Sequence, residues 1–141
     1  MRYALQVRLP LLLAVLLVSG ACDNGDTPTT PTDPPTVTES FTGTVSRNGS
    51  QTHSFVASAA GTVTATLSAV SPADSPVIGF SMGTWDGVVC TAVLTNNAAT
   101  TTSVLTGTVV GISSLCVRLF DSTGEVPANA AVNYTITVER P

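Results

Sequence analysis

Few residues in this sequence could do chemistry, and cysteine is the type whose spacing says most. The 141-residue chain has three cysteines, and two of them, Cys90 and Cys116, lie in a region of alternating hydropathy. The N-terminus described below indicates export, and an even pair of cysteines in an exported protein is expected to form a disulfide. Such a bond would close a loop of about 25 residues and contribute about 3 kcal/mol to stability. The alternative is a pair of buried free thiols.

His53 is the only histidine and the one candidate for acid–base catalysis. Its neighbours Thr52 and Ser54 carry hydroxyl groups, as a hydrolase nucleophile would. However, the sequence has no Gly-x-Ser-x-Gly turn and no acidic residue at a recognisable spacing from the histidine. We therefore predict a protein without catalytic residues, and a small secreted hydrolase that uses His53 is the alternative.

Trp85 is the only tryptophan and the best candidate for ligand binding. It precedes Asp86 in the turn-forming sequence Gly83-Thr84-Trp85-Asp86-Gly87. The favoured interpretation is that the indole caps the open end of a hydrophobic core. The alternative is a carbohydrate- or protein-binding module that uses Trp85 and Asp86, because a tryptophan on a turn can stack on a sugar ring or anchor a protein partner.

Acidic residues in predicted turns are the candidates for holding a metal ion. Each of them stands alone, and the sequence contains no Asp-x-Asp-x-Asp-Gly run. We predict no metal site and no cofactor. Loops that converge at one end of a sandwich leave a Ca²⁺ site as an open alternative. The four acidic residues are Asp74, Asp86, Asp121 and Glu125.

The first 21 residues have the layout of a secretory signal peptide. Arg2 and Arg8 precede an apolar run over residues 9–18, and small residues follow it. The run is shorter than the roughly 20 residues that a membrane-spanning helix needs, which argues against the alternative of a transmembrane anchor. Residues 1–21 are therefore expected to be removed on export.

Cys22 follows the small residues directly, and Ser19-Gly20-Ala21-Cys22 resembles the lipobox of bacterial lipoproteins. Ser19 departs from that family, which most often has leucine there. The resemblance implies cleavage before Cys22 and attachment of diacylglycerol to its thiol, and two or more acyl chains anchor a protein stably. The expected location is the bacterial cell envelope, membrane-anchored in the periplasm or at the surface. The alternative is an ordinary signal peptide that leaves a free thiol.

Residues 22–38 are predicted to form a disordered tether, because they are rich in proline, threonine and aspartate and have almost nothing to bury. The chain from Cys22 onward has no lysine and three arginines against nine acidic residues, a net charge of −6. Such an acidic chain argues against nucleic acid as a partner. The expected partners are the membrane, through Cys22, and a glycan or an envelope protein.

Residues 39–141 have a hydropathy period of two and predict one all-β domain. Alternation is clearest over residues 62–69, where Val63, Ala65, Leu67 and Ala69 are expected to share a face. Asn48-Gly49 is a strong hairpin signal. Short strands at this spacing predict an antiparallel β-sandwich. The expected strands lie near residues 40–46, 51–57, 61–69, 77–84, 88–95, 101–110, 112–121 and 131–140.

Five segments of this region resemble the bacterial pre-peptidase C-terminal domain. The resemblance implies a small jelly-roll-like β-sandwich, which in that family usually accompanies secreted enzymes. Roles in secretion, substrate binding or solubility have been proposed for it. No enzyme domain precedes it here, so the domain is expected to stand alone on its tether. The segments are Phe41-Thr42-Gly43-Thr44, His53-Ser54-Phe55, residues 61–67, residues 115–121 and Tyr134-Thr135-Ile136-Thr137-Val138.

Overall fold

A computed structural model describes residues 32–141 of the chain. The predicted signal peptide, the lipidation residue Cys22 and most of the predicted tether lie outside the described residues. Residues 32–36 are exposed and precede the first strand. Within residues 32–141, no helix has the length and hydropathy that a membrane crossing requires.

Eight β-strands make up the fold, as the hydropathy pattern predicted. Their alternating exposure matches the alternation of apolar residues with threonine and serine, which places one face of each strand toward the other sheet. The strands are β1 (Val37–Val45), β2 (Ser50–Ala57), β3 (Gly61–Ser71), β4 (Ile78–Trp85), β5 (Cys90–Ala99), β6 (Val104–Val109), β7 (Ser113–Asp121) and β8 (Val132–Arg140).

The strands form two four-stranded antiparallel sheets, with the orders β1-β8-β3-β6 and β2-β7-β4-β5. These are the strand orders of a jelly roll, so the predicted fold class is confirmed. Successive strands alternate in direction, and each sheet edge faces an edge of the other sheet. On one side β1 faces β2, and on the other β5 faces β6.

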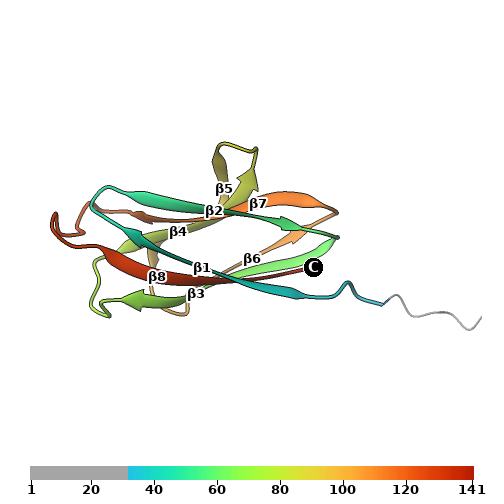
Figure 1. Ribbon diagram of the computed structural model, residues 1–141, viewed down its shortest axis with the longest axis horizontal. Coiled ribbons are helices and arrows are strands. Elements are labelled where there is room, and N and C mark those ends of the chain that lie inside the picture. Colours follow the sequence, from blue (N-terminus) through green and yellow to red (C-terminus); the bar gives the residue numbers. More distant parts are fainter. Residues whose placement is uncertain (1–31) are drawn as a thin grey trace, which may run out of the picture. The chain divides into compact units, whose positions relative to one another are not determined.

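The two ends of the sandwich differ in which connections and which ends of the folded chain lie there. The chain enters β1 at Val37 and leaves β8 at Arg140 at the same end, where these two residues pair. The β2–β3 and β6–β7 connections also lie at this end, which we call the tether end, whereas the β4–β5 hairpin bends away from the strand direction and projects from the side of the sandwich (Figure 1). The other four connections define the far end.

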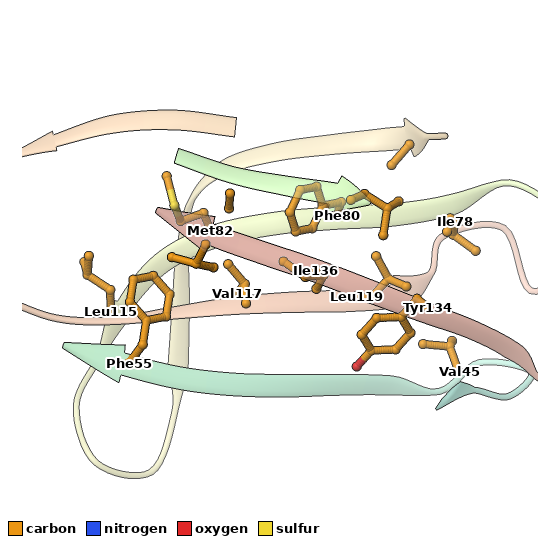
Figure 2. Packing of buried hydrophobic residues seen from close by; sticks show 14 of the residues in the cluster. Val45, Phe55, Ile78, Phe80, Met82, Leu115, Val117, Leu119, Tyr134 and Ile136 are labelled. Carbon is orange, nitrogen blue, oxygen red and sulfur yellow. The ribbon is translucent and has the colours of Figure 1, made fainter. Parts of the chain in front are cut away.

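The core lies between the sheets and is almost entirely aliphatic and aromatic. Phe80, Leu119 and Ile136 are completely buried, and their side chains meet between the strands in Figure 2. Burying a side chain of this size contributes about 1.5–3 kcal/mol, so residues of this kind account for most of the driving force. Leu115, Val117 and Leu119, which alternate along β7, belong to the core cluster.

Strand β1 begins three residues earlier than predicted. Val37 and Thr38, assigned to the tether, pair with Arg140 and Glu139 of β8. The Arg140 guanidinium also contacts the Glu39 carboxylate at 2.8 Å and fixes this end of the strand. Local sequence carries no signal for this extension, because the added residues pair with a strand about 100 positions away.

Two further expectations about the strands are wrong. Ala69 is exposed, because a register shift between Leu67 and Ala69 reverses the facing of the strand and turns Val70 to the core. Residues 96–99, which fall between the expected strands 88–95 and 101–110, stay within β5. The chain turns instead over residues 100–103, where Thr102 adopts a φ of 77°.

Candidate functional site

The disulfide between Cys90 and Cys116 is present, as predicted, with an S–S distance of 2.01 Å. It joins β5 to β7 across the intervening strand β4, so the β4–β5 hairpin folds over the outer face of its own sheet. Gly83 of β4 makes this crossing possible, because a Cβ atom there would overlap the backbone carbonyl oxygen of Thr91. The disulfide and the glycine together fix the base of the hairpin.

Trp85 is the last residue of β4 and pairs with Cys90. Its side chain is half-buried, and it lies outside the cluster of core residues. Trp85 therefore lies opposite a cysteine of the disulfide in the strand pairing, and part of the residue is open to solvent. An indole held in this way on a rigid hairpin can present its ring to a ligand or to a lipid interface.

Asp86 adjoins Trp85, but its carboxylate is used by the turn itself. Its Oδ1 atom accepts hydrogen bonds from the backbone N–H groups of Val88, at 2.8 Å, and Val89, at 2.6 Å. These hydrogen bonds lower the pKa of Asp86, and the carboxylate is fully exposed. Gly87 completes the turn with a φ of 103°. Asp86 therefore shapes the loop and contributes a negative charge at its tip.

Two connections expose valine and isoleucine in turns, where polar residues are usual. In the β4–β5 hairpin, Val88 is 81% and Val89 55% exposed. In the β6–β7 turn, Val110 is 100% and Ile112 81% exposed. Sequence reasoning missed this feature because it assigned all four residues to strands. The available signal was two valines directly after the Asp86-Gly87 turn.

An apolar groove of about 330 Å³ opens between the edge strands β5 and β6. Buried Met82 and Leu115 form its floor, while Val93 and Val110 line it from the exposed side. Among residues 32–141, none of those that line it is charged. Its volume lies within the range of small-molecule sites, and its open edges could also accept an extended chain.

The far end of the sandwich is polar by contrast. Asp121 there accepts hydrogen bonds from the backbone N–H groups of Asn48 and Gly124, both at 2.9 Å. Partial desolvation opposes these hydrogen bonds, but they outweigh it and lower the pKa of Asp121. The Arg47 Nε–H donates to the Val126 carbonyl oxygen at 2.8 Å. The charged groups at this end thus join its loops to one another.

The side where β1 faces β2 is closed by side chains, and His53 belongs to this closure. The imidazole stacks on Phe41, with ring centroids 5.0 Å apart, and its Nε2 atom lies 2.8 Å from the Tyr134 hydroxyl oxygen. Burial lowers the pKa of His53 and raises that of Tyr134 to about 12. We call His53, Phe41 and Tyr134 the aromatic seam. These contacts pack residues of the two sheets against each other.

The acidic residues considered as metal ligands do not come together as a group of three. In the part of the chain that the structure describes, no three histidine, cysteine, aspartate or glutamate side chains come together as a metal site would require. Asp86 and Asp121 bond to their own turns.

Comparison with known proteins adds no family to this description. No protein-family model matches the chain, and no curated protein matches it either.

Proposed function

We propose that this protein is a non-enzymatic lipoprotein of the bacterial cell envelope, which displays a β-sandwich on a short tether attached to the membrane at Cys22. The observation that carries the proposal is how the three cysteines are used. Cys90 and Cys116 bond to each other, as expected in an oxidising compartment. Cys22 is the remaining cysteine, and it follows an apolar run and three small residues.

The tether supports the same proposal by its composition and length. Fifteen positions separate Cys22 from Val37, the first residue of β1. A proline-rich segment spans up to about 3.1 Å per residue, so the sandwich would stand at most about 45 Å from the lipid. That distance suits a structural or binding role close to the membrane.

Mass spectrometry of the mature N-terminus tests the proposal. In a bacterial host we expect the purified protein to begin with an acylated Cys22. The substitution Cys22→Ser should abolish both the lipid and this cleavage, because the thiol is the attachment point. Cys90→Ala serves as the matched control and should keep the lipid. A mature protein with an unmodified thiol at position 22 would refute the anchor.

A second candidate function is binding of a glycan or an envelope protein through the hairpin that bears Trp85. The partly exposed Trp85, which pairs with Cys90 of the disulfide, favours it, because a rigid aromatic surface loses little entropy on binding. We expect Trp85→Ala to abolish binding on a glycan array and Trp85→Phe to retain part of it. Glycan binding that Trp85→Ala leaves unchanged would remove the hairpin from consideration.

We do not propose a hydrolase. His53 stacks on Phe41 and contacts the Tyr134 hydroxyl group, contacts that hold the ring in the aromatic seam. Unchanged background activity of His53→Ala against ester and peptide substrates is the expected result. Hydrolysis that this substitution abolishes would restore the alternative.

A further inference from the structure

We propose that two copies of this chain pair through strand β6, which lies at one edge of the β1-β8-β3-β6 sheet. The two β6 strands would run antiparallel about a two-fold axis at Gly107 and join a sheet of each copy into one continuous sheet. This inference is independent of the lipid anchor, because it depends on the folded residues alone.

The two sheets have four edge strands, and three of these edges are blocked or irregular. The Thr44 N–H of β1 donates to the Gln51 side-chain oxygen of β2 at 3.3 Å, and the Arg140 Nε–H of β8 donates to the Val56 carbonyl oxygen of β2. Strand β5 departs twice from regular register with β4, and bulges of this kind disfavour pairing along an edge. Strand β6, by contrast, pairs with β3 in one unbroken register.

The outer edge of β6 has backbone groups that are free to bond to another strand. Within residues 32–141, no strand pairs with this edge. The Leu67 N–H of β3 donates to the carbonyl oxygen of Ser103, immediately before β6, at 2.9 Å. Because the bonds of an antiparallel pair recur at every second residue, the odd-numbered residues of β6 bond to β3 and the even-numbered residues present their N–H and C=O groups outward. Thr106 and Thr108 can therefore exchange hydrogen bonds with a further extended strand.

The sequence of this edge is nearly a palindrome, so the strand is complementary to itself. Residues 104–110 read Val-Leu-Thr-Gly-Thr-Val-Val, centred on Gly107. With Gly107 on the two-fold axis, even-numbered residues of one copy face even-numbered residues of the other, so the free backbone groups meet. Pairs of threonine and pairs of apolar residues are favourable across antiparallel strands. The facing pairs, one residue from each copy, are Val104 with Val110, Leu105 with Val109 and Thr106 with Thr108.

Gly107 itself points to the close approach of another backbone, because glycine in the interior of a strand often marks such a place. The fold of one copy does not require glycine here. A Cβ atom at this position would meet the Met82 Cε atom at 3.4 Å and the Leu94 Cδ1 atom at 3.6 Å, which are ordinary contact distances. In the dimer the two glycines would form the central pair without hydrogen bonds, in which Cα atoms approach to about 4.5 Å, and would leave the axis free of side chains.

Charge favours a second copy of the chain as the occupant of this edge. The chain from Cys22 onward carries a net charge of −6, so two copies repel each other over much of their surface. Residues 87–117, which include β5 and β6, contain no charged residue and no proline, the residues that usually protect exposed strand edges. Val104 is 52% and Val110 100% exposed in one copy, and each would cover the other in the dimer. Two acidic copies can therefore meet at β6 without bringing like charges together.

Disulfide crosslinking of Gly107→Cys tests the pairing, because Cα atoms about 4.5 Å apart on the axis lie within the range that a disulfide spans. Mild oxidation of intact bacteria that express the full chain should give a linked dimer that the parent protein lacks. The matched control Thr42→Cys places a thiol at an exposed position of β1, the opposite edge of the same sheet, and should stay monomeric. Equal crosslinking of the two variants would refute pairing through β6. Crosslinking of Gly107→Cys to a different protein alone would refute the second copy and assign the edge to that protein.

A charge swap in the Gly107→Cys protein tests the register, because Val104 of one copy faces Val110 of the other. Val104→Glu with Val110→Glu should reduce the linked dimer about tenfold, since like charges would face each other in two symmetric pairs. Val104→Lys with Val110→Glu should restore it, because the facing charges are then opposite. The control Val56→Glu with Val77→Glu adds two acids at other exposed valines and should leave the dimer unchanged. Equal loss in the two variants at Val104 and Val110 would refute this register.

Hydrogen exchange of the unsubstituted protein gives a second measurement that does not depend on an added cysteine. A pairing confined to one strand is expected to bury less than the roughly 1,200–2,000 Å² of a standard interface, so the dimer should depend on concentration. Exchange in the peptide that covers Thr106 and Thr108 should become slower as the concentration of the purified mature protein rises, while exchange in β1 stays unchanged. Exchange in β6 that stays the same up to about 1 mM protein would refute the pairing.

Discussion

Removal of the disulfide should lower the stability of the sandwich by an amount that the fold allows us to work out. Cys90 and Cys116 are 26 positions apart, with Cα atoms separated by 5.8 Å. In the chain-entropy model a crosslink closing a loop of this length stabilises the fold by about 3.5 kcal/mol. Replacing both cysteines by alanine should remove that contribution while keeping the buried Cys116 position apolar.

The expected shift in melting temperature follows from the size of the domain. Residues 37–141 form the folded part, and an unfolding entropy of about 2.1 cal/mol/K per residue converts about 3.5 kcal/mol into a decrease of about 15 °C. Differential scanning calorimetry at one pH measures it. Reducing the parent protein should produce a decrease of similar size, because both treatments free the same loop.

A matched substitution outside the domain isolates the effect. Cys22→Ala changes the third cysteine, so the melting temperature of the folded domain should stay unchanged. A decrease of less than about 4 °C in the double variant would refute the reasoning, because it would mean that the hairpin holds its place over β7 without the covalent link.

Three further predictions concern side chains that the structure places closely. Gly83→Ala should destabilise the protein by about 1–3 kcal/mol in urea unfolding, because the added Cβ atom would overlap the Thr91 carbonyl. Gly111→Ala is the control and should change stability little, because the space around Gly111 is open. Equal effects of the two substitutions would contradict the close approach of the hairpin to β4. Because the pKa of His53 is lowered in the folded state, the neutral imidazole contributes fully to the free energy of unfolding above pH 6.5, and this contribution is lost as the pH falls through the folded-state pKa. His53→Gln should therefore flatten the acid side of a plot of unfolding free energy against pH. An unchanged slope would exclude the histidine as the cause of the loss. Burial raises the pKa of Tyr134 to about 12, so the unfolded chain ionises at a lower pH than the folded protein, and stability should fall as the pH rises from 10 toward 12. Tyr134→Phe should remove this loss. A spectrophotometric titration that shows ionisation near pH 10 in the folded protein would refute the burial of Tyr134.

Local sequence was sufficient for the parts of the fold that depend on alternation and on turns. Asn48 adopts a positive φ of 53° in the predicted Asn-Gly hairpin, and Gly87 and Gly124 do so in two other predicted turns. What local sequence lacks is pairing information. The bulge that exposes Ala69 and the early start of β1 at Val37 both depend on the register with β8.

The candidate site also has features that local sequence predicts and features that depend on how the strands pair. The cysteine count was sufficient to predict the bond between Cys90 and Cys116, because few pairings were possible. That this bond crosses β4 depends on how the strands are ordered, which no spacing reveals. The apolar turn at Val110 and Ile112 was hidden for another reason: a two-residue period cannot distinguish an exposed valine in a turn from one at a strand end.

The pairing of β1 with β8 decides how the domain would respond to mechanical load. Nine residue pairs join them, from Val37 with Arg140 to Val45 with Val132. If the membrane pulls on the tether while a partner grips the far end, the force runs along β1 and shears all nine pairs at once. Pulling Val37 away from Arg140 would instead unzip the strands pair by pair from one end. A domain held at the membrane and loaded from its far end would therefore resist detachment better than the same fold pulled apart by its two termini.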